Sequence, residues 1–89
     1  MENPMPDRDT DPIDIESRRL ARWIDACRHI GAPAGGLLEE LHGLTTDPTR
    51  HRLQRCAKAA RYAESVSTGE QKLIANAAAA ELEDAATAP

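Results

Sequence analysis

The chain has 89 residues, which suffice for one small domain, and it carries a formal net charge of −4. Large apolar residues are scarce: there are eight Leu, five Ile, one Val, one Trp and no Phe. A chain of this size buries only about 60% of the surface that its unfolded form exposes, so the core must be small. Two cysteines exclude a disulfide framework, and we therefore expect a partner or a second copy of the chain to supplement the core.

The beginning of the chain, MENPMPDRDTDPIDIE, is acidic and polar, whereas a signal peptide is basic and then apolar. No apolar run has the length needed to cross a bilayer. These features predict a cytoplasmic protein without a membrane partner and with reduced cysteines. Sixteen Ala, and nine Arg against two Lys, are typical of a GC-rich genome and favour a bacterial or phage source.

The charge is distributed unevenly along the chain. Residues 1–16 carry six acids and one Arg, residues 17–66 carry nine bases and five acids, and residues 67–89 carry four acids and one Lys. A basic middle thus lies between two acidic ends. Such asymmetry indicates a partner of opposite charge more directly than the net charge does.

The composition predicts an all-α protein, a bundle of three to four helices. Ala, Leu, Arg and Glu favour helix, and no segment alternates with the period of a strand. Residues 1–12 contain three Pro among acidic and polar residues, and we expect a disordered or loosely attached arm there. Residues 13–86 are expected to form the single helical-bundle domain, and residues 87–89 a frayed tail.

The first helix is expected over residues 13–30. Its apolar stripe is flanked by Trp23 and Ile30, and the members of the stripe are Ile13, Leu20, Ile24 and Cys27. Gly31 and Pro33 end the helix. Trp23 either closes the edge of the core or anchors a dimer, because aromatic residues serve both purposes.

A short second helix fits residues 33–42, ended by Gly43, with its apolar side formed by Leu37, Leu38 and Leu41. The two glycines at 35–36 oppose helix formation, so whether this segment is helical stays open.

The third helix is expected from Asp47 as N-cap and Pro48 as first helical residue to about Ser65. Ser67 and Glu70 have the spacing of a capping box and predict the start of a fourth helix. Its apolar face is expected to comprise Leu73, Ile74, Ala77, Ala78 and Leu82. Short connections between the helices predict an antiparallel arrangement.

The third helix presents one apolar and one basic side. Leu53, Cys56, Ala57, Ala60 and Ala63 lie on its apolar side. The opposite side is continuous and basic, and its candidate partner-binding residues are Arg50, Gln54, Arg55, Lys58, Arg61 and Tyr62. One interpretation is a solvated helix surface, which is the usual fate of a run of charges.

A second interpretation of the basic side is a protein interface, in which Arg and Tyr contact an acidic partner. The chain is then a small non-enzymatic regulator or inhibitor, expected to be a homodimer. A third interpretation is that the chain is a helix-turn-helix DNA-binding regulator with its recognition helix at residues 48–65, because Arg and Gln side chains can recognise guanine and adenine. The connection HGLTTDP is long for that motif, and the acidic ends oppose binding to phosphates. A structural subunit of a larger assembly is a further alternative.

Neither a metal site nor a catalytic site is expected. Cys27 and His29 lie two residues apart and therefore point to different sides of a helix. His51 and Cys56 also point to different sides of their helix. The chain has no CxxC, HxxxH, GxSxG or phosphate-binding loop, and both cysteines lie on apolar helix sides. We therefore expect no cofactor and no enzymatic activity, and leave open whether Cys27 and Cys56 pair.

Overall fold

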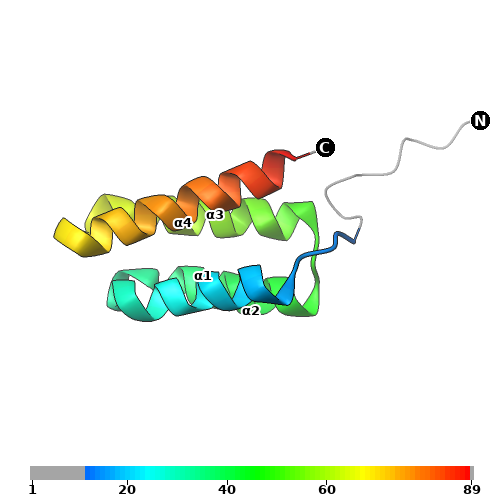
Figure 1. Ribbon diagram of the computed structural model, residues 1–89, viewed down its shortest axis with the longest axis horizontal. Helices are drawn as coiled ribbons and strands as arrows, with labels where there is room; N and C mark the ends of the chain where they lie inside the picture. Colours follow the sequence, from blue (N-terminus) through cyan, green and yellow to red (C-terminus); the bar gives the residue numbers. More distant parts are fainter. Residues whose placement is uncertain (1–11, 89) are drawn as a thin grey trace, which may run out of the picture.

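The computed structural model describes residues 12–88, in which the chain forms four α-helices. These are α1 (Ser17–Ile30), α2 (Gly35–Thr46), α3 (Arg50–Val66) and α4 (Gly69–Thr87), with a 3₁₀ turn, η1 (Ala32–Ala34), before α2. Figure 1 shows two layers, α1 beside α2 and α3 beside α4, and α1 also packs against α4 as α2 does against α3. The predicted all-α bundle is confirmed, and residues 12–88 form four α-helices where three to four were expected. No helix among the described residues has the length and apolarity to cross a membrane.

The chain enters the bundle in an extended conformation. The predicted helix over 13–30 is wrong at its start, because α1 begins only at Ser17. The amide of Ile13 donates to the carbonyl of Pro48 over 2.7 Å, and Pro12 forms an isolated antiparallel bridge with Thr49. The hydrogen bond satisfies the amide of Ile13 outside a helix, and Ile13 and Ile15 pack against the core. The arm expected over residues 1–12 otherwise lies outside the described residues.

The segment after Gly31 is helical for longer than expected. The prediction of 33–42 is wrong at both ends, since η1 precedes α2 and α2 continues past Gly43 to Thr46. Continuation places Leu44 in line with Leu37 and Leu41, and all three side chains are buried. The energy of burying one more Leu outweighs the poor helix propensity of one Gly, which is about 1 kcal/mol.

The starts of α3 and α4 differ by one or two residues from the prediction. Thr49, not Asp47, caps α3: its hydroxyl accepts a hydrogen bond from the amide of Arg52 at 3.2 Å, and Asp47 instead follows the end of α2. Thr68 precedes α4, and neither it nor Ser67 makes the expected cap hydrogen bond. The hydroxyl of Ser67 is buried and has no hydrogen-bond partner within residues 12–88.

Buried residues of all four helices form one hydrophobic cluster. The apolar side predicted for α3 is confirmed, since Leu53, Cys56, Ala57, Ala60 and Ala63 are all buried. The side predicted for α4 is partly wrong: Leu73 is 69% exposed and Ala77 is exposed. The buried residues of α4 are Ala75, Ala78, Ala79, Leu82 and Ala86. Small Ala side chains allow α4 to approach α3 closely. Because α4 also packs against α1, the side of α4 that is buried is the one that faces both helices.

Trp23 lies inside the core, with 1% of its surface exposed. Its indole Nε1 donates to Glu81 on α4 at 3.1 Å, and Arg22 donates to the same carboxylate oxygen at 2.7 Å. The hydrogen bond from Arg22, more than that from Trp23, lowers the pKa of Glu81 below its ordinary value. Trp23 was considered either as a residue at the edge of the core or as a dimer anchor, and its burial corresponds to a role in the core. Glu81 satisfies the indole N–H, which is the one polar group of the Trp23 side chain.

Candidate partner-binding surface on α3

The basic side of α3 is held in place by contacts to α2, to α4 and to the connection between α2 and α3. At its first turn, Arg50 donates to the carbonyl of Ala86 at 2.9 Å and to that of Ala88. These carbonyls lie at the end of α4, where the helix has no further amides to satisfy them. Arg50 thus caps the C-terminal end of α4, and two of the N–H donors of Arg50 are used within the bundle.

Further along α3, Arg55 reaches α2, where its guanidinium lies 2.9 Å from Glu40. Arg52 lies 3.4 Å from Asp47 in the connection between α2 and α3. Two more of the positive charges on α3 therefore have acidic neighbours, which reduces the charge that this side presents to a partner.

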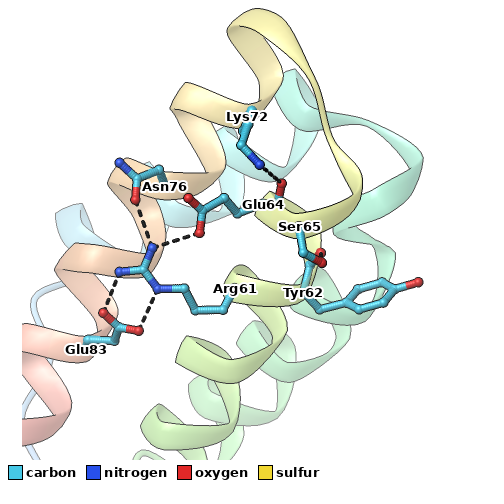
Figure 2. Close-up of polar contacts among 7 residues, drawn as sticks. All are labelled: Arg61, Tyr62, Glu64, Ser65, Lys72, Asn76 and Glu83. Atoms are coloured by element: carbon cyan, nitrogen blue, oxygen red, sulfur yellow. Dashed lines mark hydrogen bonds and ion pairs between the residues drawn. The ribbon is translucent and has the colours of Figure 1, made fainter.

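Arg61 links α3 to α4 through the densest polar network of the described chain (Figure 2). It donates twice to the carboxylate of Glu83, from Nε at 2.7 Å and from a terminal nitrogen at 2.6 Å. The other terminal nitrogen donates to Glu64 and to Asn76, each at 2.8 Å. The hydrogen bonds to Glu83 and then to Glu64 raise the pKa of Arg61, and the hydrogen bond from Arg61 lowers the pKa of Glu83.

Tyr62 and Lys58 differ from these arginines because they face solvent. In Figure 2 Tyr62 points away from the Arg61 network, and 63% of its surface is exposed. Lys58 is exposed and has no carboxylate within 4.0 Å among the described residues. Of the six candidate residues, these two offer the most unengaged surface.

A shallow groove of about 390 Å³ lies between α3 and α4, and we call it the α3/α4 groove. It is lined by Gln54, Ala57, Lys58, Arg61, Glu83, Ala86 and Thr87. Three of the candidate residues, Gln54, Lys58 and Arg61, thus meet at one depression, whereas Arg50, Arg55 and Tyr62 do not line it. Because Ala57 and Ala86 carry only methyl groups, the floor is apolar and the rim is polar.

The sequence did not reveal the α4 residues of this surface. Glu64 lies three positions after Arg61, a spacing at which helical side chains meet, so that pair could have been found. Glu83 and Asn76 lie 22 and 15 positions from Arg61 along the chain. Their approach depends on how α4 aligns with α3, which no local pattern records.

The structure gives no support for a reactive thiol or for a metal site among the described residues. Cys27 and Cys56 are both buried free thiols. Burial raises the pKa of Cys27 to about 11 and that of Cys56 to about 12, so neither is a thiolate at neutral pH. Within residues 12–88 no three His, Cys, Asp or Glu side chains gather as metal ligands. Comparison of the chain with protein-family models, with curated proteins and with solved structures gives no match.

Proposed function

We propose that this chain is a small non-enzymatic regulatory or inhibitory protein that binds another protein through the basic side of α3 and the adjoining α3/α4 groove. The observation that carries the proposal is the groove itself, which combines an apolar alanine floor with the polar rim of Gln54, Lys58 and Arg61. Protein interfaces typically have an apolar centre and a polar rim.

The charges around the groove define the chemistry of the partner. Arg61 is already matched by Glu83 and Glu64, so it contributes shape and rigidity. Lys58 supplies the unmatched positive charge, and Tyr62 supplies exposed aromatic surface one turn further along α3. A fitting partner places a carboxylate near Lys58 and small apolar side chains against Ala57 and Ala86.

DNA binding is the alternative, and one observation favours it. The connection between α2 and α3 is only three residues long, residues 47–49, which is the length of a helix-turn-helix turn. The objection from a long connection therefore does not hold. Figure 1, however, shows α2 and α3 running back along one another, whereas the helices of that motif cross steeply.

The use of the arginines also favours a protein partner over DNA. Phosphate binding depends on the number of cations that can replace counterions. Arg52, Arg55 and Arg61 each lie within 4.0 Å of a carboxylate, and Arg50 donates to carbonyls at the end of α4. The carboxylates beside Arg52, Arg55 and Arg61 would compete with a phosphate.

The proposal includes self-association of the chain as a homodimer. The further alternative, a structural subunit of a larger assembly, would use the same exposed surface. Leu73, Ala77 and Ala80 are exposed at helical spacing along the outer side of α4. A second copy would bury apolar surface that the small core leaves in water. Light scattering at micromolar concentration should give a mass near twice 9.7 kDa. A mass of one chain would contradict this part of the proposal.

The test of the partner-binding site is a pull-down from a lysate of the source cells, with and without nuclease. Lys58→Glu and Tyr62→Ala should each weaken capture of the same protein by at least about tenfold, the effect of losing about 1.4 kcal/mol. Arg18→Glu is the matched control, because Arg18 is exposed on α1 and the change in charge is the same. Circular dichroism should show equal helicity in all variants.

Two results would contradict the proposal. Undiminished capture by both Lys58→Glu and Tyr62→Ala would show that the partner binds elsewhere. Loss of capture after nuclease treatment, together with a DNA mobility shift that weakens steeply with salt, would favour the DNA-binding alternative.

A further inference from the structure

A second cavity, of about 290 Å³, shares no lining residue with the α3/α4 groove. We call it the Trp23 pocket. Its volume is close to the lower end of the range for small-molecule sites, about 300 to 1,000 Å³. It lies where the extended entry segment, α1, the start of α3 and the end of α4 meet.

The walls of the Trp23 pocket combine apolar and polar surface in similar amounts. Ile13 and Ile15 form one side, and Trp23 and Leu53 belong to the core beneath them. The wall exists because residues 13–16 are extended and anchored by the hydrogen bond from Ile13 to Pro48. An aliphatic chain placed against these side chains would leave water for an apolar environment.

Two guanidinium groups give the pocket its polar character. Arg19 lies with its central carbon 5.1 Å from the centre of the Trp23 ring, and Arg50 is held by the carbonyls of Ala86 and Ala88. Both arginines are half-buried, and no carboxylate of residues 12–88 lies within 4.0 Å of either. Each guanidinium has five N–H donors, so Arg50 keeps donors beyond the two that reach α4.

The charge balance of the lining favours an anion. Asp14 is the single acid among the lining residues, against Arg19 and Arg50. A carboxylate is the natural acceptor for arginine donors, because its two oxygens match the fork of the guanidinium. Partial burial strengthens such a hydrogen bond relative to one in bulk water.

We propose that the Trp23 pocket binds a small amphiphilic carboxylate, with the anionic group on Arg19 and Arg50 and a short aliphatic chain against Ile13 and Ile15. This site lies apart from the α3/α4 groove, and Arg50 is the one candidate partner-binding residue that also lines it. An acidic side chain of residues 1–11, which precede Ile13, offers the same carboxylate chemistry, and the test separates the two sources.

The test uses octanoate as the probe and the full chain. Trp23 is the one tryptophan of the protein, so its fluorescence reports on the pocket directly, and calorimetry measures affinity. Octanoate should produce a saturable change, and octylamine, with the same chain and the opposite charge, should bind at least about tenfold more weakly. Arg19→Gln and Arg50→Gln should each weaken octanoate binding by about tenfold, whereas the control Arg18→Gln should not.

A second protein carries Glu2→Gln, Asp7→Asn, Asp9→Asn and Asp11→Asn together. Equal octanoate binding by this protein and the wild type would support a free carboxylate as the ligand. Binding only to the neutralised protein would support the same anion site with the chain's own acids as its occupant. Absence of binding to both proteins, equal affinity for octylamine, or unchanged affinity in both arginine variants would overturn the proposal.

Discussion

Gly36→Ala should stabilise the protein. Gly36 lies in the first turn of α2, and a Cβ atom added there would meet nothing within 4 Å. Alanine restricts the unfolded chain and favours the helix, which together contribute about 0.4–1 kcal/mol to the free energy of unfolding. For a domain of this size the midpoint of thermal unfolding should rise by roughly 2–8 °C.

Gly31→Ala is the matched control, because the chemical change is the same and the expected sign is opposite. Gly31 ends α1 with φ of 90° and ψ of −146°, a conformation that L residues rarely adopt. A Cβ atom there would also meet nothing within 4 Å, so the loss comes from the backbone alone. We expect the free energy of unfolding to fall by about 1–3 kcal/mol.

Urea unfolding followed by far-ultraviolet circular dichroism measures both free energies. The slope of the transition should be the same in the two variants and the wild type, since neither change alters the buried surface. A neutral or destabilising Gly36→Ala would refute the assignment of this residue to α2. A neutral Gly31→Ala would refute the backbone conformation given for the end of α1.

Three further predictions concern the core and its thiols. Leu82→Ala should lower the free energy of unfolding by about 2–5 kcal/mol, because Leu82 is fully buried. Leu73→Ala, at a residue 69% exposed in the single chain, should change the free energy of unfolding of the monomer by less than about 0.5 kcal/mol. Chemical denaturation of both variants, at a concentration where the chain is monomeric, checks this. A thiol reagent at neutral pH should label Cys27 and Cys56 in the unfolded chain but not in the native one. Their raised pKa values also favour the folded state below an ordinary pKa of 9.0, and this contribution falls as the pH rises towards 11. The variant with both cysteines changed to Ala should therefore lose less stability between these pH values, and an equal loss would contradict the assignment.

The apolar side of α3 was predictable from the sequence because it depends on local periodicity. The predicted helix starts were less accurate. Asp47 and Thr49 are both good caps, and so are Ser67 and Thr68. Which of them occupies the N-cap position depends on where the preceding helix ends, and α2 ends late because Leu44 enters the core. Gly43 misled the prediction because its local propensity is overridden by that burial.

The candidate surface was predictable only in part. Its basic residues follow from helical spacing, but the sequence could not show that Arg61 is bound by Glu83 and that Arg50 donates to the end of α4. Those contacts join residues far apart in the chain, and they decide which cations are left for a partner. The Trp23 pocket was likewise hidden, because residues 13–16 were expected to be helical.

The amino-acid sequence by itself determined the all-α class, the helical character of α1, α3 and α4 and the apolar side of α3, since composition and period act over a few neighbouring residues. Only the tertiary structure decided where each helix begins, which side of α4 is buried and how the charges pair. The reason is physical: these features depend on the alignment of one helix with another, and that alignment is set by the simultaneous packing of small side chains from all four helices.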